Sequence, residues 1–319
     1  MTVPSIPHES VSRPYRILSL DGGGIRGVLT TRILERIETA CPGFVSKIDL
    51  IAGTSSGAMI AVGVAKGLPL SQVVSNFVRS GPIIFRRTFM RTVLGLMGVF
   101  SAKYGAGPRR ETLAEAFGDI TLGELQKRVV LSTFQLDSKN KFAPSDTVPR
   151  MWKAKFFHNY PGRDSDAAAN AVDVVMRSSA APTYFPIYQG FIDGGVVANN
   201  PAMCGVAQAV HPNGGGQSLG SLVLLSLGTG LTPATISSLY GNFGFARWGL
   251  RLFDLIAAGG VGLPDYQCSQ ILCDRYCRVD PVYTQHVAID DPNGIDALLK
   301  MANDADLAPC IAWIKSKWL

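Results

Sequence analysis

The segment GTSSG (53–57) fits the pattern G-x-S-x-G, with an apolar run before it and the apolar helical pattern AMIAVGVAKG after it. In a strand–turn–helix context, the central Ser55 lies on a sharp turn that exposes its hydroxyl for nucleophilic attack. Gly53 and Gly57 tolerate that turn and let a substrate approach, while the following helix directs its positive end at developing negative charge. The pattern predicts a nucleophilic serine; the alternative is a glycine-rich turn whose serine only caps the helix.

A second glycine loop, SLDGGGIRG (19–27), follows the apolar run YRILSL, and its glycines at 22, 24 and 27 fit G-x-G-x-x-G. Such a loop aims backbone N–H groups at an anion, which is either a pyrophosphate or the oxyanion of an acyl-transfer reaction. Asp21 stands directly against the first glycine, where a pyrophosphate would lie, and therefore counts against a dinucleotide. We expect Gly22, Gly23 and Gly24 to serve an oxyanion, with a nucleotide-dependent oxidoreductase as the competing enzyme class.

A nucleophilic serine needs a proton acceptor. None of the histidines stands in the usual loop context of an α/β-hydrolase triad; they are His8, His158, His211 and His286. Asp193 is the stronger candidate, because it follows an apolar pair and precedes Gly194 and Gly195, which allow another loop to approach closely. Residues 194–246 carry no formal charge, and burial beneath them would raise the pKa of Asp193 toward neutrality. The alternative is a turn aspartate ahead of a glycine pair.

The composition restricts the class of protein. The chain has 319 residues, 47% of them hydrophobic, which suffices for a large folded core. Its formal net charge of +6 favours anionic partners, but the basic residues are scattered and no nucleic-acid motif accompanies them. We expect no transmembrane span, no export signal and a cytoplasmic protein. The six cysteines lack paired C-x-x-C spacing, so we expect reduced thiols and no metal.

Alternating strand and helix patterns predict an α/β fold with a central, mostly parallel sheet covered on both faces. Strands are expected at 15–20, 47–54, 128–136 and 221–230, where apolar runs are bounded by glycine or polar residues. Helices are expected at 28–39, 56–66, 70–79, 110–117, 167–179, 202–210 and 245–256, and at the C-terminus. Without repeats or a linker, we expect an N-terminal tail (1–14) followed by a single domain (15–319).

In chain order, DGGGIRG, GTSSG and the DGG at 193–195, with SSAAPTYFP (178–186) and LSLGTG (225–230), resemble the patatin-like phospholipases. The resemblance covers roughly residues 15–230 and implies a three-layer α/β/α fold. It further implies a lipid acyl hydrolase of the phospholipase A or lysophospholipase type that uses a Ser55–Asp193 dyad without histidine. The glycine loop would be the oxyanion hole, with Arg26 at the family's basic position, and neither metal nor cofactor would be needed. A salt-bridging surface residue is the alternative for Arg26.

The resemblance also implies partners. The substrate would be a phospholipid or lysophospholipid, and some bacterial members are defence effectors switched on by cyclic nucleotides. A small nucleotide activator and an antiphage role are therefore alternatives for this chain, as is a non-catalytic lipid-binding protein. Two basic apolar segments, 83–100 with Arg86, Arg87 and Arg91 and 243–253 with Arg247 and Arg251, predict peripheral contact with anionic membranes. The alternative is that both are packed helices whose arginine stems cover the core edge.

Overall fold

The computed structural model describes residues 13–86, 101–139 and 149–319, except 232, 234, 237–240, 243, 245–247, 249–251 and 284–286. Most of the predicted N-terminal tail lies outside the described residues. So do Arg87, Arg91, Arg247 and Arg251 of the two predicted membrane segments. Of the histidines, His8 and His286 also lie outside them.

The described residues form a seven-stranded sheet in the order β4-β3-β2-β1-β6-β7, with β5 also paired to β3. The strands are β1 (Tyr15–Leu20), β2 (Leu50–Thr54), β3 (Arg128–Gln135), β4 (Lys153–His158), β5 (Phe191–Asp193), β6 (Leu222–Leu227) and β7 (Tyr276–Val279). Strands β3, β2, β1, β6 and β7 run parallel, whereas β4 and β5 pair antiparallel with β3. The four predicted strands are found within one or a few residues of their expected bounds.

The helices are α1 (Gly27–Ala40), α2 (Ser56–Lys66), α3 (Leu70–Ile84), α5 (Ala106–Phe117), α6 (Ala171–Ser178), α7 (Gly195–Ala198), α8 (Ala202–Val210), α10 (Leu252–Leu272), α11 (Ile295–Asp304) and α12 (Ala308–Lys317). Short 3-10 helices are η1 (Gly24–Arg26), η2 (Val45–Lys47), η4 (Leu122–Glu124), η5 (Leu219–Ser221), η7 (Cys273–Arg275) and η8 (Pro292–Gly294). Of the helix predicted at 245–256, residues 245–247 and 249–251 lie outside the described residues, Trp248 is helical, and the last part belongs to α10, which continues through Pro264 to Leu272. The helix predicted at 167–179 begins four residues later, where the Asn170 side chain caps α6.

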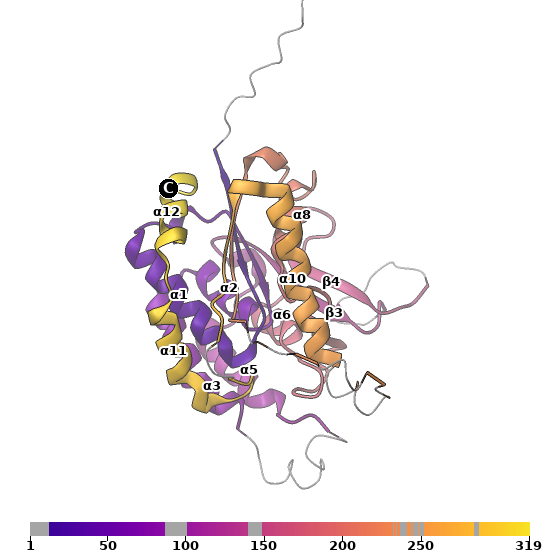
Figure 1. Cartoon of the computed structure of the whole chain (residues 1–319). Helices are drawn as coiled ribbons and strands as arrows, with labels where there is room; N and C mark the ends of the chain where they lie inside the picture. Colours follow the sequence, from indigo (N-terminus) through magenta and orange to yellow (C-terminus); the bar gives the residue numbers. More distant parts are fainter. Residues whose placement is uncertain are drawn as a thin grey trace, which may run out of the picture.

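Both faces of the sheet are covered by helices. Successive side chains of a strand point to opposite faces, and apolar side chains are buried on both. In β1, Leu18 and Leu20 join the core cluster that contains α1, α2, α6 and α11 residues, whereas Ile17 joins the cluster with α8 and α10. Figure 1 shows α8 and α10 on one side of the sheet and α1, α11 and α12 on the other. This is the predicted three-layer α/β/α arrangement with a mostly parallel sheet.

Three further features bear on the predictions from composition. Within the described residues, no helix combines the length and apolar character needed to cross a bilayer. None of the six cysteines is joined in a disulfide. The part of the chain that the structure describes also contains no group of three or more His, Cys, Asp or Glu side chains arranged to hold a metal ion.

Candidate active site

Ser55 lies on the turn between β2 and α2. Its backbone has φ 54° and ψ −118°, a conformation that is strained for a residue with a side chain and typical of a nucleophile elbow. The turn brings α2 tightly against β1, so a Cβ at Gly57 would overlap the carbonyl of Leu20, and one at Gly53 would overlap the backbone of Gly57. The two motif glycines are therefore required by close backbone approach, and the Ser55 hydroxyl is exposed to the pocket described below.

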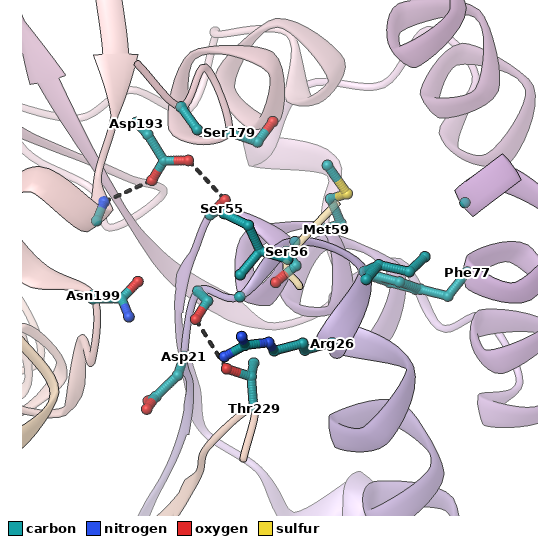
Figure 2. Close-up of a pocket in the computed structure, with 18 of the residues that line it drawn as sticks. Asp21, Arg26, Ser55, Ser56, Met59, Phe77, Ser179, Asp193, Asn199 and Thr229 are labelled. Carbon is teal, nitrogen blue, oxygen red and sulfur yellow. Dashed lines mark hydrogen bonds between the residues drawn. The ribbon is translucent and has the colours of Figure 1, made fainter. Parts of the chain in front are cut away.

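Register along β3 explains why Asp193 lies beside Ser55. Strand β2 ends at Thr54, which is paired with Ser132, and β5 ends at Asp193, which is paired with the next residue, Thr133. The parallel β2 and the antiparallel β5 thus approach each other end to end along the same edge of β3. The Ser55 Oγ donates a hydrogen bond of 2.7 Å to Asp193 Oδ2 (Figure 2).

The Asp193 carboxyl is buried, with 3% of its surface exposed. Burial raises its pKa to about 6, although hydrogen bonds from the Gly195 N–H and from Ser55, and the positive charge of Arg109, oppose this increase. The Gly195 N–H donates to Oδ1 at 2.7 Å and fixes the carboxyl plane. Gly194 has no room for a side chain, because a Cβ there would overlap the carbonyl of Ser132.

The glycine loop after β1 lies next to Ser55, and an added Cβ at Gly22 would be 3.2 Å from the Ser55 Cβ. The Gly22 N–H donates to the Asn199 carbonyl at 3.0 Å, so this group is already engaged. The N–H groups of Gly23 and Gly24 have no partner among the described residues. Of the three glycines predicted to serve an oxyanion, Gly23 and Gly24 are thus the two with donors available to a substrate.

Segments from distant parts of the chain hold the glycine loop. Thr229 in the LSLGTG segment donates from Oγ1 to the Gly22 carbonyl at 3.1 Å, as the dashed line in Figure 2 marks. Arg26 donates from Nε to the Val287 carbonyl at 2.8 Å, and its guanidinium lies 5.2 Å from the Tyr283 ring centroid. Arg26 has no ion pair with a carboxylate among the described residues, so the salt-bridge alternative is not what the structure contains.

Asp21, whose position next to Gly22 counts against a dinucleotide site, has 1% of its surface exposed and is paired with a cation. Arg278 of β7 donates to Asp21 at 2.7 Å and to Asp280 at 2.6 Å. Neither β7 nor the role of Arg278 is predicted from the sequence. The pair neutralises a carboxylate that would otherwise lie unpaired beneath the glycine loop.

The segment Ser178–Ala180, part of the SSAAPTYFP motif, holds both Ser55 and Asp193. The Ser178 hydroxyl accepts the Ser55 N–H at 2.9 Å and donates to the Ser132 carbonyl at 2.8 Å. The Ala180 carbonyl accepts the Asp193 N–H at 3.0 Å. These bonds stabilise the strained turn at Ser55 and align the two side chains.

Arg109 of α5 fixes that segment from behind and was missed in the sequence. It is completely buried, donates to the carbonyls of Ser179 and Met176, and lies 4.1 Å from the Phe185 ring centroid. No carboxylate forms an ion pair with it among the described residues; burial lowers the pKa of Arg109 to about 10, and the negative charge of Asp193 opposes this decrease. Nothing local in its sequence distinguishes Arg109 from the adjacent, exposed Arg110.

Ser55 and Asp193 open into a pocket of about 700 Å³. Its lining includes the glycine loop, α2, α3, α5, the segment after α6 and residues between 257 and 265 of α10. Neither described histidine takes part. His158 lies on β4 near Asp164, and His211 is the exposed C-cap of α8.

Comparison with known proteins identifies this arrangement. Residues 18–204 match the family of patatin-like phospholipases, more than half of the chain. The chain belongs to the patatin-like phospholipase family. It is 31% identical over 278 residues to the cGAMP-activated phospholipase of Pseudomonas aeruginosa, covering 83% of this chain and 78% of the relative.

Other family relatives span bacteria and plants. The putative sporulation hydrolase CotR of Bacillus subtilis is 28% identical, with 95% of this chain and 98% of that protein covered. Patatin-like protein 2 of Arabidopsis thaliana is 28% identical, with 73% and 64% covered. The resemblance stated from the motifs is thereby confirmed, and family membership makes the chain a lipid ester hydrolase.

Proposed function

We propose that this patatin-like phospholipase cleaves acyl esters of phospholipids or lysophospholipids through Ser55 and Asp193. Ser55 Oγ attacks the acyl carbonyl while its proton passes to Asp193 Oδ2. The Gly23 and Gly24 N–H groups stabilise the oxyanion of the tetrahedral intermediate. The ester C–O bond then breaks, Asp193 returns the proton to the leaving alcohol, and the acyl group stays on Ser55.

The second half-reaction uses the same groups. Water attacks the acyl-Ser55 ester while Asp193 accepts a proton from that water. The bond between the acyl carbon and Ser55 Oγ then breaks, Asp193 returns the proton to Oγ, and the fatty acid is released. Gly22 and Arg26 act as positioning residues in this proposal, because the Gly22 N–H already binds Asn199 and the Arg26 Nε already binds Val287. The observation that supports the proposal is the 2.7 Å bond between Ser55 and a buried Asp193, beside two N–H groups that no described residue binds.

Product analysis tests this function. The protein is incubated with a panel of phospholipids, lysophospholipids and neutral lipids, and released fatty acids and lysolipids are identified by mass spectrometry. We expect fatty acid release from at least one ester lipid and none from ether-linked analogues. Release of a phosphorylated head group without fatty acid would contradict the acyl hydrolase.

We further propose that a cyclic nucleotide activates the enzyme, since the Pseudomonas aeruginosa relative is named a cGAMP-activated phospholipase. The same panel with and without cyclic GMP–AMP tests this regulation. Activation would raise fatty acid release without changing the product. Equal release in both arms, together with no thermal shift on adding the nucleotide, would reject it.

The pH dependence of kcat/KM should follow the ionisation of Asp193. Because burial raises its pKa to about 6 and the carboxylate form is the base, kcat/KM should fall as the pH drops below about 6. On the acidic limb the fall should approach about tenfold per pH unit. The measurement uses a short soluble ester, so that lipid aggregation does not change with pH.

Arg109 provides the second half of that experiment. Its buried positive charge favours the carboxylate, so Arg109→Gln should move the midpoint of the acidic limb to higher pH. Arg109→Lys keeps the charge and should retain a midpoint nearer the parent's, with circular dichroism establishing that both variants fold. A folded Gln variant with the parental midpoint would reject this electrostatic role.

We propose that anionic bilayers hold the enzyme at its substrate. Ile84 and Phe85, at the end of α3, line the pocket, and the next residue, Arg86, is exposed, so the basic segment begins at the pocket. Replacing Arg86, Arg87 and Arg91 with glutamine should weaken binding to anionic vesicles about 100-fold, at about 1 kcal/mol per residue. Added salt should mimic the variant, while hydrolysis of a soluble ester provides the control. Parental binding by the folded variant would show that this segment does not meet the membrane.

A further inference from the structure

The pocket extends away from Asp193 along helix α2. Met59 and Gly63 follow Ser55 at four-residue intervals and therefore lie on one face of the helix. Leu68, just beyond the C-cap of α2, also lines the pocket. With 11 residues in α2 and a rise of 1.5 Å per residue, the lining runs about 16 Å from the nucleophile.

Helices α3 and α5 form the opposite walls. Val73 and Phe77 of α3, and Leu113 and Phe117 of α5, line the pocket at helical spacings of four residues. Figure 2 shows Met59 and Phe77 together on the side of Ser55 away from Asn199. We define the acyl channel by six residues: Met59, Gly63, Leu68, Val73, Leu113 and Phe117.

The walls of the acyl channel suit an amphiphile. Val73, Leu113 and Phe117 are at most 5% exposed, and none of the six residues is charged. The polar lining residues of the same helices, Asn76, Ser80 and Thr112, are partly exposed. The other arm of the pocket, by contrast, contains the charged side chains of Asp265, Arg278 and Asp280, whose desolvation would oppose a hydrocarbon chain.

At the far end of the channel, hydrogen bonds join the helix ends that form its walls. Leu68 N–H donates to the Gly63 carbonyl at 3.0 Å, and Lys66 Nζ donates to the Phe117 carbonyl at 2.8 Å, which ties the ends of α2 and α5 together. Halfway along, the channel wall is tightly packed at Gly63, because a Cβ there would lie 3.3 Å from Val73 Cγ2 and 3.8 Å from Leu68 Cδ1. Glycine is unfavourable inside a helix, and the close approach of Val73 explains its presence here; a larger side chain would press on Val73 and Leu68 and narrow the channel.

We propose that the acyl channel binds one fatty acyl chain of the substrate, and that Gly63 and Leu68 set the chain length the enzyme accepts. This inference rests on the proposed function and names the part of the substrate that each wall contacts. A chain attached at the Ser55 end would extend past Met59 and Gly63 toward Leu68. Each methylene buried there should raise kcat/KM about fourfold until the channel is full, after which the gain should stop.

A chain-length series tests the proposal. For each variant, kcat/KM is measured on p-nitrophenyl esters from butyryl to palmitoyl. All measurements are made below the concentration at which the ester aggregates. Each value is divided by that of the butyryl ester in the same variant. Gly63→Val should end the rise at a shorter chain than in the parent, and Leu68→Ala at a longer one. Gly259→Val is the matched control, since Gly259 also lies within a helix, is not a lining residue and has no atom within 4 Å of an added Cβ.

The outcomes separate this inference from the function itself. An identical chain-length limit in the parent and in Leu68→Ala would overturn the channel even if Gly63→Val did not fold. If the parent hydrolysed no ester, the proposed function would fail, and the channel would be tested by thermal shift with saturated fatty acids of increasing length. The increase in melting temperature should then grow with fatty acid length up to a limit. That limit should be reached at a shorter fatty acid in Gly63→Val and at a longer one in Leu68→Ala. No shift in that limit would reject the channel.

Discussion

Replacing Ser55 with alanine should lower kcat on an ester lipid by about four to six orders of magnitude while leaving the fold intact. The loss is this large because the hydroxyl is both the attacking atom and the donor to Asp193. Activity is measured as fatty acid release at saturating substrate, and thermal unfolding verifies the fold. Ser55→Ala removes the hydroxyl but keeps the hydrogen bond from the backbone N–H of residue 55 to the Ser178 hydroxyl, so the strained turn should persist.

Asp193→Asn belongs to the same prediction. The amide cannot accept the proton, so kcat should fall by about four orders of magnitude, and the double variant should lose little more than Ser55→Ala alone. Asp304→Asn, at an exposed residue of α11 paired with Lys300, is the matched control and should keep parental activity. Near-parental turnover in a folded Asp193→Asn, or additive losses in the double variant, would contradict a Ser–Asp unit.

The parts of the site that the sequence predicted share one property: their chemistry depends on adjacent residues. Gly53 and Gly57 flank Ser55, and Gly194 and Gly195 follow Asp193. Close packing at these positions requires glycine, so the requirement can be seen in the sequence next to each catalytic candidate. Their union in space was inferred only from order and resemblance. In the structure that union depends on the β3 register, which no local pattern specifies.

Arg109, Ser178 and Arg278 could not be assigned in this way. Arg109 and Arg110 are consecutive on α5, yet one is buried beneath Ser179 and the other is exposed. The difference arises from helix orientation, which becomes defined only when α5 packs on α6. Arg278 likewise acquires its role from β7 pairing with β6, which brings it beside Asp21 from 257 residues away.

In the fold, too, elements with a local sequence pattern were predicted, and elements defined by tertiary packing were not. Apolar runs predicted the central parallel strands, because both faces of those strands are buried and leave a continuous hydrophobic pattern. The antiparallel β4 and β5 do not follow that pattern: β4 alternates lysine and apolar residues, and β5 has three residues. Glycines at 259, 260 and 262 and Pro264 obscured the helical character of α10, whose packing against α7 and α8 overrides low helix propensity.

Gly23→Ala should lower kcat about 100-fold with little change in KM. An added Cβ at Gly23 would overlap the side chain of Thr229, whose hydroxyl holds the Gly22 carbonyl, so the loop must move. Movement misaligns the Gly23 and Gly24 N–H groups, whose contribution is greatest when the oxyanion develops, and loss of one such donor typically costs about 10²- to 10³-fold in kcat.

The kcat-to-KM division distinguishes an oxyanion hole from a binding loop. Gly259→Ala, where an added Cβ meets no atom within 4 Å, is the matched glycine control and should leave both constants unchanged. Phosphonylation of Ser55 by a fluorophosphonate also develops negative charge on oxygen, so its rate should fall in parallel with kcat. A higher KM with parental kcat and parental labelling would mean that the glycine loop binds the substrate in its ground state, and the oxyanion donors would then have to lie elsewhere, with the first turn of α2 as the nearest backbone N–H groups.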